Sequence, residues 1–303
     1  MDRIETMKAF LAVSEEGGFT KAAEKLATSN QLVSKYVSDF EEHLGVRLFN
    51  RTTRSVSLTE AGEQCVLHVR QIIDRLQDME SGLGQLKSQA QGLLRINAPV
   101  SFSIKHLACL ISDYKKQYPS VGINLQLNDR KVDVVEEGFD LALRIGHLRN
   151  SSLVAKRIAP IRLVLVASPE YLERNGIPKH PDQLIPQHFL HYSYMNYDQP
   201  QSPLFDALKA ASKDQATSIS SNNGDILIQA AIAGDGYALQ PTFLVGEAIK
   251  QGQLKVILNE FEPKGLGLYA VYPHRQLMAT KLRTFIDFIS EYYGDKPYWD
   301  DFN

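Results

Sequence analysis

Five polar side chains follow one side of a short predicted helix that opens near Ser29. They are Asn30, Gln31, Ser34, Lys35 and Ser38. Amide side chains can pair with adenine through two hydrogen bonds, hydroxyls reach bases or phosphates, and a lysine can meet guanine or a phosphate. The set therefore indicates a surface that reads double-stranded DNA. A solvated helical surface has similar residue types, so this pattern alone leaves DNA binding and simple solvation open.

Three arginines lie within a stretch without acidic residues that runs from His43 to Leu58. They are Arg47, Arg51 and Arg54. Guanidinium groups bind phosphate oxygens, so the stretch is predicted to form a wing that contacts the DNA backbone. Arg51 and Arg54 are expected to bind phosphates together with Thr20, which is also a candidate N-cap of the preceding helix.

Apolar spacing predicts the three helices that must position these side chains. Their apolar faces are Met7, Phe10, Leu11 and Val13, then Ala22, Ala23 and Leu26, then Leu32, Val33, Tyr36, Val37, Phe40 and Leu44. Gly45 is expected to end the third helix. The second and third helices, joined by the turn at 27–29, have the proportions of a helix-turn-helix. Residues 1–58 are therefore predicted to be a DNA-binding domain.

Residues 59–91 are predicted to form one long linker helix with a coiled-coil seam. The seam consists of Cys65, Val69, Ile72, Leu76, Met79, Leu83 and Leu86. These residues alternate spacings of four and three, which is the repeat through which two helices pair. The pattern favours dimerisation, although the same helix could instead pack on its own domain.

From Gly92 onward, strands alternate with helices, which predicts an α/β body with a mostly parallel sheet. The predicted strands are 93–98, 121–127, 139–145, 163–167, 237–239, 254–258 and 266–272, and the predicted helices are 103–118, 132–137, 225–233, 243–250 and 277–293. The length of this region, 92–303, predicts two lobes: lobe I at about 92–161 and 267–303, and lobe II at about 162–266. A small ligand would lie between them.

Bulk composition agrees with a folded globular protein. The 303 residues are 44% hydrophobic and their formal net charge is −2, which excludes a disordered chain or a polycation. Residues 1–58 contain eight basic and eight acidic side chains, so their net charge is zero. The positive charge expected to bind DNA must therefore be concentrated in one part of this region. No apolar run is long enough to span a membrane, the N-terminus has no signal-peptide pattern, and two cysteines fit a reducing compartment, so a cytoplasmic location is expected.

The sequence resembles the LysR-type transcriptional regulators over essentially its whole length. The amino-terminal residues that carry the resemblance are Phe10, Ala12, Val13, Gly17, Phe19, Thr20, Ala22, Ala23, Leu26, Ser29, Val33, Ser34, Val37, Phe40, Glu41, Leu44, Gly45, Leu48, Phe49, Arg51, Arg54, Leu58, Thr59, Ala61 and Gly62. The segments 140–146 and 234–239 also resemble family segments. One departure is that Gln240 separates Leu239 from Pro241, where the family usually has Leu-Pro.

The resemblance implies a winged helix-turn-helix, a linker helix that pairs with a second subunit, and a two-lobed effector-binding domain like a type 2 periplasmic binding protein. It also implies a homodimer or homotetramer, without a cofactor, that binds inverted repeats in promoter DNA and communicates with RNA polymerase.

By the same resemblance, the effector is expected between the lobes, near the start of the first helix of the body. Ser101 and Phe102 are the leading candidate contacts, and a helix N-terminus with a hydroxyl favours an anion such as a carboxylate. Ser101 could equally act only as a helix cap. Further candidates are Asn128, Arg130, Arg144, Asn222 and Gln229.

Two other functions remain as alternatives. One is an α/β enzyme whose helical head serves only for oligomerisation, and the other is an architectural DNA-binding protein without an effector. No set of residues indicates a catalytic site: a Gly-x-Ser-x-Gly elbow is absent, Gly234 and Gly236 lack the third glycine of a dinucleotide fingerprint, and His188 and His191 lack further metal ligands. Cys65 and Cys109 are expected to be small apolar fillers.

Overall fold

The computed structural model describes residues 2–51, 56–83, 90–130, 132–147, 153–195, 202–213, 219–273 and 278–302. The chain divides into two compact units, which we call the head unit and the body unit. The head unit is Met1–Gln89 with Leu277–Thr280, and the body unit is Ala90–Gln276 with Lys281–Asn303. In the described part of the chain, no helix combines the length and the apolarity that crossing a membrane requires.

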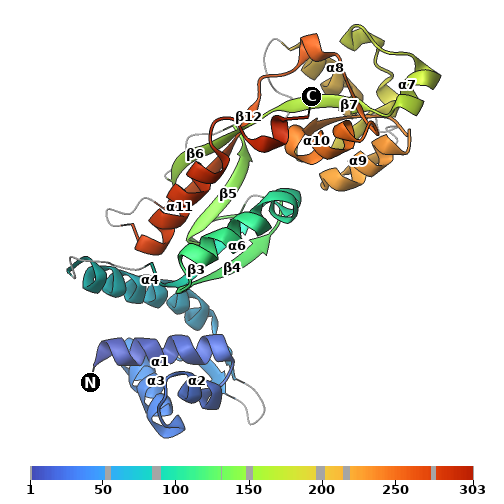
Figure 1. The fold of residues 1–303 in the computed structure, drawn as a ribbon. Helices are drawn as coiled ribbons and strands as arrows, with labels where there is room; N and C mark the ends of the chain where they lie inside the picture. Colours follow the sequence, from blue (N-terminus) through green and yellow to red (C-terminus); the bar gives the residue numbers. More distant parts are fainter. Residues whose placement is uncertain are drawn as a thin grey trace. The chain divides into compact units, whose positions relative to one another are not determined.

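The head unit is helical with one small hairpin (Figure 1). Its elements are α1 (Arg3–Glu16), α2 (Phe19–Lys25), α3 (Asn30–Leu44), β1 (Phe49–Arg51), β2 (Val56–Leu58) and α4 (Glu60–Leu83). Phe10, Val13, Val33 and Val37 are completely buried at the centre of its core. The three predicted amino-terminal helices are thus confirmed, and each exists because one apolar face packs on the other two.

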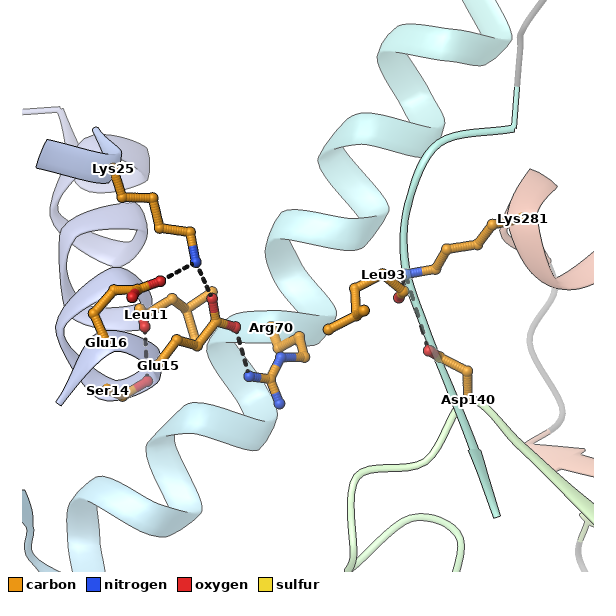
Figure 2. A network of polar contacts seen from close by, with 9 residues as sticks. All are labelled: Leu11, Ser14, Glu15, Glu16, Lys25, Arg70, Leu93, Asp140 and Lys281. Atoms are coloured by element: carbon orange, nitrogen blue, oxygen red, sulfur yellow. Dashed lines mark hydrogen bonds and ion pairs between the residues drawn. The ribbon is translucent and has the colours of Figure 1, made fainter. Parts of the chain in front are cut away.

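Acidic and basic side chains join three helices of the head unit, as Figure 2 shows. The Glu15 carboxylate at the end of α1 accepts hydrogen bonds from Lys25 of α2 at 3.0 Å and from Arg70 of α4 at 2.9 Å. Lys25 also donates to Glu16 at 2.8 Å. Burial alone would raise the pKa of Glu15, but these hydrogen bonds outweigh it and the pKa is lowered. The network therefore holds the first part of α4 against the helix-turn-helix.

The body unit contains two lobes, each built on its own sheet. Its strands are β3 (Gly92–Ala98), β4 (Val121–Leu127), β5 (Leu141–Gly146), β6 (Leu153–Ile161), β7 (Leu163–Ala167), β8 (Leu190–Tyr192), β9 (Ile219–Ser221), β10 (Tyr237–Pro241), β11 (Lys255–Ile257) and β12 (Leu266–Pro273). Its helices are α5 (Val100–Phe102), α6 (Ala108–Gln117), α7 (Pro169–Asn175), α8 (Pro203–Lys213), α9 (Gly224–Ile232), α10 (Thr242–Lys250) and α11 (Thr280–Tyr293). Short helical turns are the π-helical η1 (Ser103–Leu107) and the 3-10 turns η2 (Pro181–Gln183), η3 (Pro186–His188), η4 (Asn259–Phe261) and η5 (Tyr298–Asp300).

The first lobe, which we call the five-stranded lobe, has the strand order β4-β3-β5-β12-β6. β3 pairs in parallel with β4 and β5, whereas β12 lies antiparallel to both β5 and β6. The second, the three-stranded lobe, has the order β10-β7-β11 with both pairs antiparallel. The α/β class is confirmed, but the prediction of a mostly parallel sheet was wrong. Alternation of strands and helices along the chain did not reveal that β12 returns in the opposite direction.

Several elements of the body differ from those predicted. The helix predicted at 103–118 starts earlier, at Val100, and passes through η1 before it continues as α6. The short helix predicted at 132–137 is a single turn, in which Glu137 N–H donates to the Asp133 carbonyl at 3.0 Å. The strand β6 was not predicted, and neither were α7, α8, β8 and β9.

The start of the five-stranded lobe is tied to α11 by one buried lysine (Figure 2). Lys281 is 7% exposed and its Nζ donates to the Leu93 carbonyl at 2.8 Å, with an Asp140 carboxylate oxygen 4.0 Å away. The same Asp140 oxygen accepts from the Arg95 N–H at 2.9 Å. This arrangement fixes the beginning of β3, the strand with which the body unit starts.

The tail after α11 crosses to the other lobe and packs on α10. Asp300 in η5 accepts a hydrogen bond from Thr242, and the Trp299 carbonyl approaches Gly246. The Trp299 ring is 5% exposed and lies 5.7 Å, centre to centre, from Phe102. The tail therefore ties the two lobes together.

Candidate functional site

The third helix presents the predicted polar residues on its outer side. The Ser29 hydroxyl caps α3 by accepting from the Leu32 N–H at 3.2 Å, and Gly45 ends the helix in the left-handed conformation, as predicted. Because Val33, Val37 and Phe40 turn inward, the opposite side is left to the candidate DNA contacts. Of these, Asn30, Gln31 and Lys35 are exposed, and Ser34 and Ser38 are half-buried.

Thr20 lies beside the start of α3, but it is not an N-cap. α2 begins at Phe19, and its N-cap is Gly18, whose carbonyl accepts from the Ala22 N–H at 3.1 Å. The exposed Thr20 hydroxyl instead accepts from the Asn30 side-chain amide at 3.1 Å. The prediction of the cap was wrong because the helix starts two residues earlier than a cap at Thr20 would place it. The hydrogen bond does bring two candidate DNA contacts together.

The predicted wing is a hairpin. β1 and β2 pair antiparallel with Arg51 opposite Val56, so the backbone of Arg51 lies at the outer end of the hairpin. Arg54 lies outside the described residues. Arg47 bonds to Glu41 at 3.1 Å, and the buried Glu41 carboxylate also accepts from the Leu48 and Phe49 N–H groups at 2.8 and 3.1 Å. The base of the hairpin is thus fastened to the end of α3.

The described residues of the predicted linker seam differ in burial: the first two pack on the core of the head unit, and the third is exposed. Val69 is buried and Cys65 half-buried against the core of the head unit, whereas Ile72 is 46% exposed and Leu76 is intermediate. Burial raises the pKa of the Cys65 thiol, which suits an unreactive filler. The side chains of Met79 and Leu83, and all of Leu86, lie outside the described part.

A cavity of about 450 Å³ lies between the lobes of the body unit. It is lined by Pro99, Ser101, Phe102, Asn128, Asp129, Arg144, Ile145, Gly146, His147, Tyr192, Tyr194, Met195, Gly224, Gln240, Pro241, Phe243, Leu244, Leu266, Tyr269 and Val271. The fold brings four predicted effector contacts to it: Ser101 and Phe102 from α5, Asn128 from the segment directly after β4, and Arg144 from β5. A volume of this size accommodates a small organic ligand.

Three other predicted effector contacts do not line the cavity. Arg130 pairs with Glu137 at 3.1 Å, so it braces its own loop. The Asn222 amide donates to the hydroxyl of Tyr194, a lining residue, at 3.4 Å, so Asn222 lies behind the cavity wall. Gln229 is exposed on α9.

Ser101 connects the lobes through a carboxylate of the protein itself. Its hydroxyl donates to Asp225, near the start of α9, and the Lys105 ammonium lies 3.5 Å from the other oxygen of that carboxylate. Phe102 is completely buried and makes an edge contact with Phe243 at 5.3 Å. Both predicted contacts therefore also join the two lobes.

Two charged groups in the cavity wall are shifted by burial. Burial raises the pKa of Asp129, although its carboxylate accepts from the Val100 N–H at 3.1 Å. Burial likewise lowers the pKa of the Arg144 guanidinium, while Glu137 and Asp129 favour its charged form. Arg144 Nη1 donates to the neighbouring Leu143 carbonyl at 3.0 Å.

The sequence reasoning missed several cavity residues, above all Gln240, Tyr192, Tyr194 and Tyr269. Of these four residues, only Gln240 stood out in the sequence, because it separates Leu239 from Pro241 where the family usually has Leu-Pro. Outside the cavity, Cys109 proved to be exposed, so the prediction that it is an apolar filler was wrong. Among the described residues, no group of three or more His, Cys, Asp or Glu side chains could hold a metal ion.

Comparisons with known proteins cover both units of the chain. The model of the "Bacterial regulatory helix-turn-helix protein, lysR family" matches residues 4–63, and that of the "LysR substrate binding domain" matches residues 87–294. An uncharacterized HTH-type transcriptional regulator from Haemophilus influenzae is 36% identical over 286 residues, which covers 93% of this chain and 98% of that relative.

Solved structures of LysR-type regulators also resemble this chain over nearly its whole length. The structure of CrgA, a LysR-type transcriptional regulator from Neisseria meningitidis, is 30% identical with a TM-score of 0.57, over 95% of this chain and 97% of that one. A full-length variant of OxyR from Pseudomonas aeruginosa has a TM-score of 0.69 at 15% identity, over 96% of this chain and 94% of that one, and this similarity concerns the fold alone.

Proposed function

Because this chain belongs to the family of LysR-type transcriptional regulators, we propose that α3 and the β1–β2 hairpin bind dyad-symmetric promoter DNA and that a small molecule in the cavity between the lobes controls this binding. The observation that carries the proposal is the cavity itself, whose walls come from both lobes. A ligand that binds one arrangement of the lobes more tightly shifts the population toward that arrangement.

The head unit supports the DNA-binding part of the proposal. Gln31 and Lys35 are exposed on the outer side of α3 and would reach base edges or nearby phosphates. Ser34 and Ser38 lie along the same side, and Asn30 with Thr20 extends it toward α2. Arg51 and Arg54 would bind the phosphates on either side.

The functional unit would be a homodimer joined through α4, or a tetramer of two such dimers. Two copies are needed to read two half-sites of an inverted repeat. Ile72, 46% exposed on α4, is a large apolar side chain that pairing would cover. Bending of the promoter and contact with RNA polymerase would follow from a change in the spacing of the two heads.

For the effector, a carboxylate near the start of α5 was the expectation from the sequence. The contact between Ser101 and Asp225 supports this choice, because it places a carboxylate on the Ser101 hydroxyl.

A gel-shift titration on the promoter region of the protein's own gene tests the DNA-binding part. We expect a dyad-symmetric footprint and an affinity that falls with salt by about 0.9 logarithmic units per neutralised phosphate. Lys35→Ala should reduce that slope by about one phosphate, whereas the control Lys250→Ala, on α10 of the body unit, should leave it unchanged. Absence of specific binding at low salt would refute the proposal. DNA binding that no small molecule changes would favour an architectural protein.

A further inference from the structure

Three buried polar atoms in residues that line the cavity have no hydrogen-bond partner among the described residues. They are Asn128 Oδ1, Arg144 Nη2 and Gln240 Nε2. Buried polar groups are nearly always paired, because leaving one unpaired costs the free energy of removing it from water. Finding three such atoms around one cavity indicates that the cavity is built for a polar ligand.

Gln240 is the best defined of the three. It is 2% exposed on β10, and the register opposite Val164 of β7 fixes the position of its backbone. Its Oε1 faces Gly224 at the start of α9: a Cβ added there would lie 3.0 Å from Oε1 and 2.8 Å from the Leu244 side chain. A side chain at 224 would press on this amide, so the glycine leaves room for a buried glutamine whose Nε2 has no partner among the described residues.

The unpaired atoms define the hydrogen-bonding character of the ligand. Arg144 and Gln240 offer donors, and one of them is cationic, so together they suit a carboxylate. Asn128 offers an acceptor, which suits a hydroxyl or amine group on the ligand. The two donors come from different lobes, Arg144 from β5 and Gln240 from β10.

The rest of the wall combines aromatic side chains with aliphatic ones and the Asp129 carboxylate. Tyr192, Tyr194, Tyr269 and Phe243 all line the cavity, and the Tyr192 and Tyr194 rings meet edge to face at 6.1 Å. Aromatic rings prefer other rings in stacked or edge contacts over aliphatic groups of similar area. A flat, conjugated ligand therefore matches the aromatic part of the wall better than a flexible aliphatic one does.

We propose that the effector is an aromatic carboxylic acid that carries a second, hydrogen-donating group. Its carboxylate binds Arg144 and Gln240, its ring packs among the tyrosines, and its donor group binds Asn128. The three unpaired atoms are closed off from solvent, so these side chains turn toward the ligand as it binds. This inference rests on the proposed function for the existence of an effector, and it assigns the polar anchors to residues other than Ser101.

Isothermal titration of the full chain with four matched probes tests this proposal. The probes are 4-hydroxycinnamate, cinnamate without the hydroxyl, 4-hydroxycinnamide without the charge, and 3-(4-hydroxycyclohexyl)propionate without the flat ring. We expect 4-hydroxycinnamate to bind most tightly and each other probe to bind about tenfold more weakly. If none of the four binds at millimolar concentration, or if the cyclohexyl compound binds as tightly as 4-hydroxycinnamate, the proposed ligand class is wrong.

Two substitutions test which residue binds each end of the ligand. Gln240→Glu places a second negative charge beside the carboxylate, so 4-hydroxycinnamate should bind at least about thirtyfold more weakly while the amide probe is much less affected. Asn128→Ala should remove the preference for 4-hydroxycinnamate over cinnamate. The control Gln229→Ala, exposed on the same lobe, should change neither affinity. Equal losses for acid and amide in Gln240→Glu, or a preserved hydroxyl preference in Asn128→Ala, would overturn the assignment.

The gel shift separates this inference from the proposed function. Promoter binding that persists in a protein that ignores all four probes refutes only the ligand class. Loss of specific DNA binding refutes the regulator itself. Circular dichroism of each variant confirms that a lost affinity is not a lost fold.

Discussion

Glu41 is the single residue on which the geometry of the hairpin depends most directly. Its carboxylate is buried, yet it accepts from two backbone N–H groups at the start of β1 and pairs with Arg47. A buried charge is stable only with such partners, and those N–H groups would otherwise lack one. One acidic side chain thus positions the segment that leads to Arg51.

Glu41→Gln should lower the free energy of unfolding of the head unit by about 1.5–3 kcal/mol, because the hydrogen bonds lose the charge that strengthens them. Urea denaturation followed by circular dichroism measures this change. The exposed neighbour provides the control, since Glu42→Gln should alter stability by less than about 0.5 kcal/mol. Equal stabilities of the two variants would show that the carboxylate does not support the hairpin.

At the scale of elements, the π-helical turn η1 is tied to α10 and to the tail through His106. Its Nε2 lies 3.0 Å from the Phe243 carbonyl and must donate there, so Nδ1 accepts from the Tyr298 hydroxyl at 2.7 Å. Burial, with a smaller effect from Lys105, lowers the pKa of His106 below its usual value. The neutral imidazole is therefore the form that connects three elements.

This histidine predicts how the stability of the body unit depends on pH. The unfolded chain binds a proton at the usual pKa near 6.5, and the folded chain only at lower pH, so stability is lost as the pH falls below about 6.5. Above that value the group contributes no dependence. Thermal unfolding between pH 5 and 8 should show this loss, with a slope of at most about 1.4 kcal/mol per pH unit.

In His106→Gln, that part of the slope should disappear. Comparing the variant with the natural protein at each pH cancels the other titrating groups, such as Asp129, which titrates in the acid range. An unchanged slope would mean that another group causes the loss of stability in acid.

Elements with local signals were predictable from the sequence, and those that depend on distant partners were not. Ser29 and Gly45 delimit α3 through contacts within a few residues, so both ends of α3 were predicted correctly. β6 was missed because Lys156, Arg157 and Pro160 break the apolar alternation, and its strand conformation comes from pairing with β12 more than a hundred residues later.

The candidate cavity follows the same rule. The family resemblance, which implies an effector near the start of the first helix of the body, led to Ser101 and Phe102, whereas Gln240 lies within a strand where a polar side chain has no local explanation. Its place in the wall results from the pairing of β10 with β7 and from the absence of a side chain at Gly224. Only the folded chain brings these features together.

At the scale of the whole molecule, two units with separate cores should unfold in two separate transitions. Glu41→Gln should move only the head transition. Tyr114→Phe should move only the body transition by about 1 kcal/mol, since it removes the hydroxyl that bonds to Lys281 O at 3.2 Å and Thr284 Oγ1 at 2.9 Å. Differential scanning calorimetry resolves the two, and a single transition that both variants shift equally would contradict this division.

The position of β12 also has a consequence for biosynthesis. This strand, Leu266–Pro273, lies between β5 and β6 in the five-stranded sheet, although the ribosome makes it about a hundred residues after them. Until it emerges, β5 and β6 each keep an unpaired edge, while the strands of the three-stranded lobe are already complete. The three-stranded lobe should therefore fold on the nascent chain before the five-stranded lobe does, because β5 and β6 keep open strand edges, available to chaperones, until β12 has left the ribosome.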